Sequence, residues 1–155
     1  MEYEKCRDIL FEQLDLVRRI GALQDRVYRE AVGQDWAGIE EHFAVLDGYG
    51  RELAALEERR EKAFPDDGGR GFYFLAARLA EPGRRELSDL YRKLKLEMLR
   101  VKAGGEALTG FIAASRAALT ALFQAAFPSG PGKTYSPQGT QASGDLRSMV
   151  VNQSF

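Results

Sequence analysis

At 155 residues the chain is long enough for one domain with a buried core, and it leaves no room for a second enzymatic domain. Hydrophobic residues make up 45% and charged residues 29%, which excludes a chain disordered throughout and favours a soluble protein over a membrane protein. A net charge of −1 excludes the strong overall field by which a protein attracts nucleic acid or acidic lipid.

The first residues and the cysteine content predict a cytoplasmic protein. The start of the chain, Met-Glu-Tyr-Glu-Lys, lacks the basic and apolar regions of a signal peptide. No stretch approaches the roughly 18 apolar residues that cross a bilayer, so we expect no membrane insertion. The single Cys6 cannot form an intramolecular disulfide, which fits a reducing compartment.

The first predicted helix runs from about residue 3 to residue 32. Ile9, Leu16 and Leu23 are spaced by sevens, and Ile20 and Val27 form a second row four residues on. This spacing is typical of one wide apolar stripe on an amphipathic helix.

A second helix is predicted from Trp36 to just before Pro65. Gly33 is suited to end the first helix, and the carboxylate of Asp35 can cap the next one, so we expect a tight helical hairpin. Apolar residues then recur at alternating intervals of three and four as far as Leu53. A further apolar cluster in residues 71–81 predicts a short helix that crosses the end of the bundle.

The longest periodic segment follows Pro82. A four-three alternation of apolar residues continues without a break for more than five heptads and predicts one helix of about 44 residues, roughly 65 Å long. The Gly104–Gly105 pair is the point where a kink or a close helix contact is expected. The two earlier helices are each roughly 45 Å long, so part of the apolar stripe of the last helix is expected to lie uncovered.

The composition changes after Pro128. Gly, Pro, Ser, Thr and Gln supply 16 of the 27 residues 129–155, which predicts a flexible tail. The predicted fold class is therefore all-α: an elongated antiparallel helical bundle or coiled coil of three long helices plus a short helix in residues 1–128, followed by the tail. Residues 145–155 could form a short amphipathic helix that orders on a partner.

Chemical sites are scarce in this sequence. One histidine and one cysteine exclude most catalytic constellations, and we interpret His42 as a boundary residue and Cys6 as a packing residue. The Gly-Pro-Gly-Lys-Thr run at residues 130–134 lacks the first glycine and the preceding strand of a phosphate-binding loop. The charge run at residues 57–62 predicts a solvated helix face with pairs such as Glu57–Arg60. We therefore expect no enzyme activity, no metal and no cofactor.

Three features in this order resemble the FlgN family of flagellar export chaperones. The features are the Gly-Gln-Asp-Trp turn at residues 33–36, the Leu-Glu-Glu-Arg-Arg-Glu close of the second helix at residues 56–61, and a very long last helix that leads to Thr-Tyr-Ser-Pro-Gln-Gly at residues 134–139. The resemblance covers nearly the whole chain, although the aromatic-rich segment 71–80 is not a family hallmark.

The resemblance implies a cytoplasmic chaperone that binds the C-terminal helical segments of the hook–filament junction proteins (the hook-associated proteins). Such a chaperone prevents premature assembly of its clients and delivers them to the flagellar type III export gate. The family's tail tyrosine contacts the cytoplasmic domain of that gate, and Tyr135 is the matching residue here.

Two groups of residues are the candidates for client contact. The predicted contacts in the tail are Leu146, Met149, Val150 and Phe155. The adjoining surface on the long helix is predicted at Leu108, Ile112, Leu119, Leu122 and Phe123. An equal alternative is that these five helix residues are all covered within the bundle.

Two other classes of protein remain as alternatives. A self-associating structural or regulatory coiled-coil protein would bury the exposed stripe against another copy, whereas a chaperone should be a monomer or a weak homodimer. A helical di-metal enzyme needs Glu-x-x-His pairs from two helices, which a single His42 cannot supply.

Overall fold

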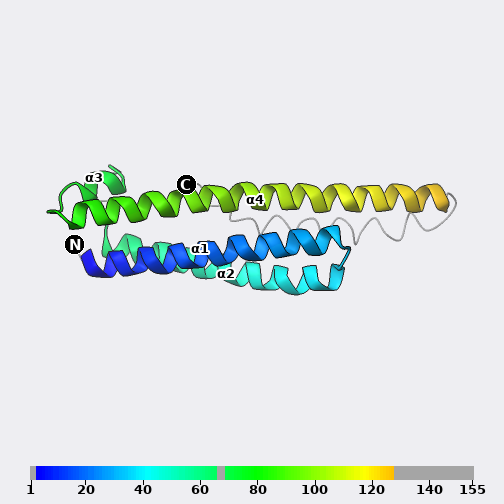
Figure 1. The fold of residues 1–155 in the computed structure, drawn as a ribbon, viewed down its shortest axis with the longest axis horizontal. Coiled ribbons are helices and arrows are strands. Elements are labelled where there is room, and N and C mark those ends of the chain that lie inside the picture. The colour runs from blue at the N-terminus through cyan, green and yellow to red at the C-terminus, as the bar shows by residue number, and fades with distance from the viewer. Residues whose placement is uncertain (1–2, 66–68, 128–155) are drawn as a thin grey trace.

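The computed structural model describes residues 3–65 and 69–127, which form an elongated array of helices (Figure 1). In chain order the helices are α1 (Tyr3–Val32), α2 (Trp36–Ala63), α3 (Phe72–Ala76) and α4 (Gly83–Ala126). The all-α fold class is confirmed, and the bounds of the three long helices agree with the apolar periodicity. The predicted tail lies outside the described residues.

The turn between α1 and α2 forms the predicted hairpin. The Asp35 side chain accepts a hydrogen bond from the backbone N–H of Gly38 at 3.1 Å, as expected of a helix cap. The left-handed residue that ends α1 is Gln34, with φ of 59°, rather than Gly33. The backbone N–H of Asp35 donates to the carbonyl of Glu30 at 2.9 Å and completes the C-terminal cap of α1.

Helix α1 is the central element, because α2 packs against one side of it and α4 against another. Figure 1 shows α4 running in the same direction as α1 and opposite to α2. With two partners, α1 buries a wider face than a single stripe: the predicted Ile9, Leu16, Ile20 and Val27 are buried, and so are neighbours on the second side. These additional buried residues of α1 are Cys6, Leu10, Gln13, Leu14, Val17, Gln24 and Ala31.

The glycine pair in α4 marks a close helix contact and leaves the helix unbroken. The Gln24 side-chain amide of α1 donates to the backbone carbonyl of Val101 at 3.1 Å. A β-carbon on Gly104 would lie 3.0 Å from the Oε1 atom of Gln24. Glycine therefore leaves room at this point for a buried glutamine that hydrogen-bonds to α4.

Helix α3 is shorter than the predicted segment and packs on the first turns of α4. The ring of Phe72 stacks on Tyr91 with centroids 4.1 Å apart, and it contacts Phe64 at 5.1 Å. Phe72, Leu75 and Ala76 are buried, so the short helix is anchored by three of its five residues.

Candidate functional site

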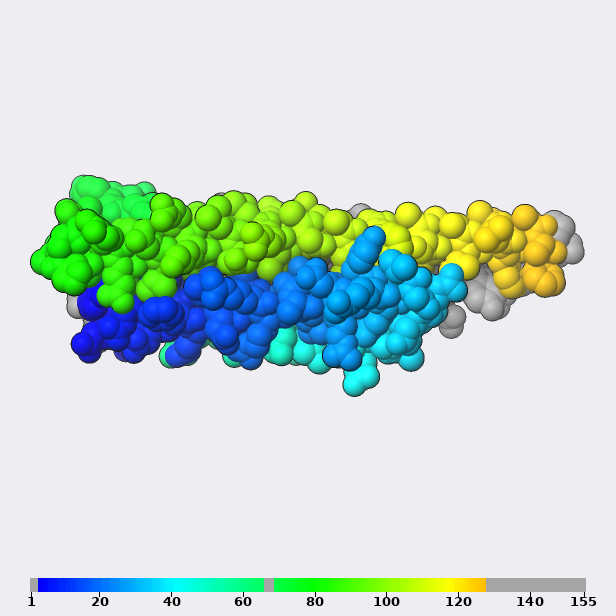
Figure 2. Space-filling view, viewed as in Figure 1, coloured from blue at the N-terminus to red at the C-terminus, as the bar shows by residue number. Residues whose placement is uncertain are grey.

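Helix α4 extends well beyond the hairpin of α1 and α2 (Figures 1 and 2). Helices α1 and α4 begin at the same level: the hydroxyl of Tyr3, the first residue of α1, donates to the carboxylate of Glu86 in the first turn of α4. From this start α4 has 44 residues and α1 has 30. At 1.5 Å per residue, α4 therefore projects past the end of α1 by roughly 20 Å.

The projecting segment (residues 113–127) is apolar and exposed. Arg116 is its single charged residue, and seven of its fifteen residues are alanine. Leu119 is 47% exposed, Leu122 is 68% exposed and Phe127 is 56% exposed. Large apolar side chains gathered on a surface of this kind are typical of a site that binds another molecule.

The structure divides the five predicted contact residues of α4 into two sets. Leu108 is 5% exposed and Ile112 is fully buried, so both belong to the core and not to an accessible surface. For these two residues the structure agrees with the alternative that they are covered within the bundle, because α1 still covers α4 at this level. Leu119, Leu122 and Phe123 lie beyond the covered part and are exposed, with the ring of Phe123 4.9 Å from that of Phe127.

The remaining predicted contacts, Leu146, Met149, Val150, Phe155 and Tyr135, lie outside the described residues. The same is true of the Gly-Pro-Gly-Lys-Thr run at residues 130–134. Their assignments stay predictions.

By length and composition α4 is also a candidate for crossing a membrane. Its most apolar stretch of 18 residues has a mean hydropathy of 1.2 and is 11% buried. The sequence expectation that no stretch approaches a membrane span therefore understated this helix. The same measure is met by helices that bury their apolar face against protein, so one such helix is weak support for a membrane span.

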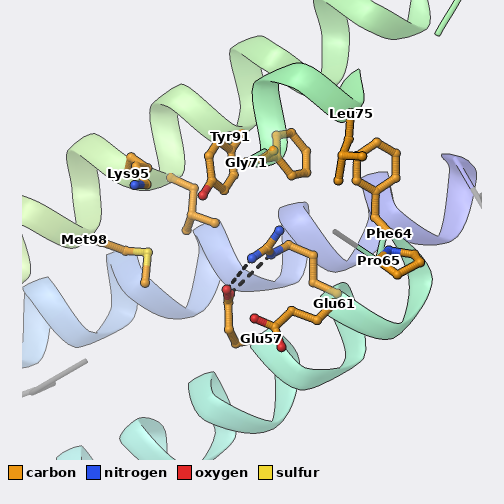
Figure 3. Close-up of a pocket in the computed structure, with 12 residues that line it drawn as sticks. Glu57, Glu61, Phe64, Pro65, Gly71, Leu75, Tyr91, Lys95 and Met98 are labelled. Atoms are coloured by element: carbon orange, nitrogen blue, oxygen red, sulfur yellow. Dashed lines mark hydrogen bonds and ion pairs between the residues drawn. The ribbon is translucent and has the colours of Figure 1, made fainter. Parts of the chain in front are cut away.

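A groove lies at the opposite end of the bundle, where α2, α3 and α4 meet (Figure 3). It has a volume of about 550 Å³ and is lined by Glu57, Arg60 and Glu61 from α2, Phe72 and Leu75 from α3, and Tyr91, Leu94, Lys95 and Met98 from α4, together with the loop residues Phe64, Pro65 and Gly71. The sequence analysis did not predict this groove, because its walls come from three separate segments, within residues 57–65, 71–75 and 91–98, that meet only in the folded chain.

Arg60 is the charged residue buried at this groove. It is 8% exposed, and its guanidinium donates to both carboxylate oxygens of Glu57. The guanidinium also lies over the rings of Phe72 and Tyr91, at 5.5 and 5.4 Å from their centroids. The predicted Glu57–Arg60 pair is therefore confirmed, but the prediction of a fully solvated face is wrong at Arg60.

The electrostatics of the groove follow from this pair. Burial opposes the charge on Glu57, yet hydrogen bonds from Arg60 and from the Gln13 amide outweigh burial and lower the pKa of its carboxyl. Burial likewise opposes the charge on Arg60, while its bonds to Glu57 raise the pKa of the guanidinium. Both groups are charged at neutral pH, and each stabilises the other. Burial also raises the pKa of Tyr91 despite the nearby Arg60.

The two residues considered for chemistry have structural surroundings. Cys6 is fully buried in the core, and burial raises the pKa of its thiol to about 11, so the thiol is protonated at neutral pH. His42 lies at the boundary between α1 and α2, with its Nδ1 atom 2.8 Å from a carboxylate oxygen of Glu30. Cys6 is therefore a packing residue of the core, and His42 links α2 to α1 through Glu30.

Within residues 3–65 and 69–127, no group of three or more His, Cys, Asp or Glu side chains is placed to hold a metal ion. The exposed apolar end of α4 and the groove beside α3 each offer a binding surface. No protein-family model, curated protein or solved structure matches this chain.

Proposed function

We propose that this protein is a flagellar type III export chaperone of the FlgN type that binds the C-terminal helical segments of hook–filament junction proteins. The observation that carries the proposal is the projecting segment (residues 113–127), in which Leu119, Leu122 and Phe127 are exposed and one residue in fifteen is charged. The choice of the FlgN type rests on the resemblance of the turn, the end of the second helix and the tail to that family.

The mechanism is recognition of one helix by another. A client helix would lay its apolar face along the projecting segment, where Leu119 and Leu122 are exposed on neighbouring positions of one helix face. Leu119 and Leu122 would be buried by the client. The tail, whose last stretch contains Leu146 and Met149, would close over the bound helix.

This arrangement explains how a chaperone could prevent premature assembly. The client's apolar segment would be covered until delivery, and the tail would carry Tyr135 to the cytoplasmic domain of the export gate. Each leucine buried on binding contributes about 1.5–3 kcal/mol at most. A small apolar segment can therefore bind its client firmly and still release it.

The test is co-purification with each of the two hook–filament junction proteins encoded in the same genome. The variant Leu119→Ser/Leu122→Ser changes the projecting segment. The matched control is Leu96→Ser/Leu99→Ser, because these two leucines are also exposed, at 61% and 54%, but lie in the part of α4 that packs beside α1. We expect the first variant to weaken binding by about 30-fold or more, equivalent to about 2 kcal/mol, and the control to bind normally.

A chain that ends at Pro128 separates the contributions of the helix and the tail. Loss of binding on truncation alone would place the client contact in the tail rather than on α4. No binding by the full-length chain, together with a stable oligomer in light scattering, would refute the chaperone proposal. That result would favour the alternative, a self-associating coiled-coil protein whose projecting segments pair with each other.

A further inference from the structure

The apolar row by which α4 packs against α1 continues past the end of α1. The buried part of this row consists of Leu94, Met98, Val101, Gly105, Leu108 and Ile112. Beyond Ile112 the same alternation of threes and fours gives Ser115, Leu119, Leu122 and Ala126, and both leucines are exposed. The projecting segment therefore keeps the surface with which α4 packs on a helix, but α1 no longer covers it.

The last turn of α1 forms one end of this uncovered row. The ring of Tyr28 contacts that of Phe111 on α4, with centroids 5.2 Å apart, so α1 lies against α4 up to the level at which the row becomes exposed. Val32, the last residue of α1, follows Tyr28 by four positions and so lies on the same face of the helix. Its side chain is 58% exposed.

Val32 and the exposed row form a corner with two apolar sides, here called the α1–α4 corner (Val32, Phe111, Leu119 and Leu122). The backbone N–H groups of residues 33, 34 and 35 donate to carbonyls in the last turn of α1 at 3.0, 3.2 and 2.9 Å. These bonds satisfy three of the carbonyls with which α1 ends. A molecule that adjoins this end therefore meets an apolar side chain and an already capped backbone.

We propose that the α1–α4 corner holds one amphipathic helix of a partner protein, about 14 residues long, which continues the line of α1 along α4 and ends against Val32. The inference rests on the proposed function, because it specifies the form and position of the client segment. Residues 113–127 extend roughly 22 Å at 1.5 Å per residue, which sets this length. Continuity with the α1–α4 interface sets the spacing of the client's apolar side chains, which recur at threes and fours as in α1 (Figure 1).

Two other occupants fit this corner less well. A second copy would supply its own projecting segment, whose row is small at Ser115, large at Leu119 and Leu122, and small again at Ala126. Two such rows would leave gaps beside their small members, which a helix with larger side chains fills. The chain's own residues 145–155 number eleven, about one turn fewer than the projecting segment, and a helix of that length is marginal.

The experiment is photo-crosslinking in the complex of the full chain with a hook–filament junction protein, followed by mass spectrometry of the linked peptides. The photoreactive benzoylphenylalanine replaces Val32 in one variant and Phe127 in another. Val45 is the control position, because it is also exposed, at 40%, but lies on α2. We expect the links from Val32 and Phe127 to fall on one client segment about 14 residues apart, and none from Val45.

Affinity measurements test the contribution of α1 to the corner. Val32→Glu should weaken client binding by about tenfold, because it places a charge against the apolar end of the client helix. Val45→Glu makes the same change on α2 and should leave binding unchanged. A client held by α4 and the tail alone would bind both variants equally, and circular dichroism confirms that each variant is folded.

The outcomes separate this inference from the proposed function. If the complex forms but Val32 and Phe127 link to the same client residues, or Val32→Glu binds normally, the inference is wrong and the proposed function stands. Links from Val32 to residues 145–155 or to a second copy of the chain would overturn it by assigning the corner to that occupant. If the unmodified chain forms no complex with either junction protein, the proposed function fails and this inference fails with it.

Discussion

Two leucines of α4 provide a direct test of where the bundle ends. Leu108 and Leu122 lie two heptads apart on the same apolar row, and Leu→Ala is the same chemical change at both positions. Leu108 is 5% exposed, whereas Leu122 is 68% exposed. The two substitutions therefore differ in burial and in little else.

The expected costs can be worked out from this burial. Leu108→Ala removes a buried side chain and leaves a cavity, so it should lower the free energy of unfolding by about 3 kcal/mol. Leu122 has about a third of its area covered, which corresponds to about 0.5–1 kcal/mol of burial, and water fills the space that is left. Alanine is the slightly better helix former, so the net cost at Leu122 should be about 0.5 kcal/mol.

The assay is urea unfolding followed by far-UV circular dichroism, with linear extrapolation to water. Measurements at two protein concentrations separate folding from self-association. If Leu122→Ala costs as much as Leu108→Ala, the projecting segment is covered in solution and the assignment of a free binding surface is wrong. A cost at Leu122 that appears only at the higher concentration would show that a second copy covers it.

Two further predictions concern the charged pair and the helical turn. Because the pKa of Glu57 is lowered in the folded chain, its ionisation stabilises the fold above the ordinary glutamate pKa of about 4.3, and this contribution is lost as the pH falls through the folded value. Glu57→Gln should thus lower the free energy of unfolding by about 1–2 kcal/mol at pH 7, once solvent screening is allowed for. Urea unfolding at about pH 3 should show a smaller difference between the variant and the original chain. An equal difference at both pH values would contradict this reasoning. Gln34→Gly should stabilise the chain by about 0.5 kcal/mol, because a side chain at φ of 59° is strained, whereas Gln34→Ala, which keeps the β-carbon, should not raise the thermal midpoint.

The elements themselves could be predicted from the sequence. The spacing of apolar residues, the Asp35 cap and the Pro-Gly pair at residues 82–83 placed the ends of the three long helices correctly. These signals are local: a helix begins and ends where capping groups and backbone preferences direct it, whatever packs against it. The same spacing predicted that α4 outreaches its partners.

Only the tertiary structure decided which helix covers which face. Apolar periodicity indicates that a face avoids water but not which partner covers it. The double burial of α1 was therefore missed, and for Ile112 an exposed contact surface and a covered position in the bundle remained equal alternatives. Arg60 reads as one residue of a solvated charge run, yet packing against Tyr91 of a helix 30 residues later buries it. The groove beside α3 arises in the same way, because it depends on segments that meet only when the chain has folded.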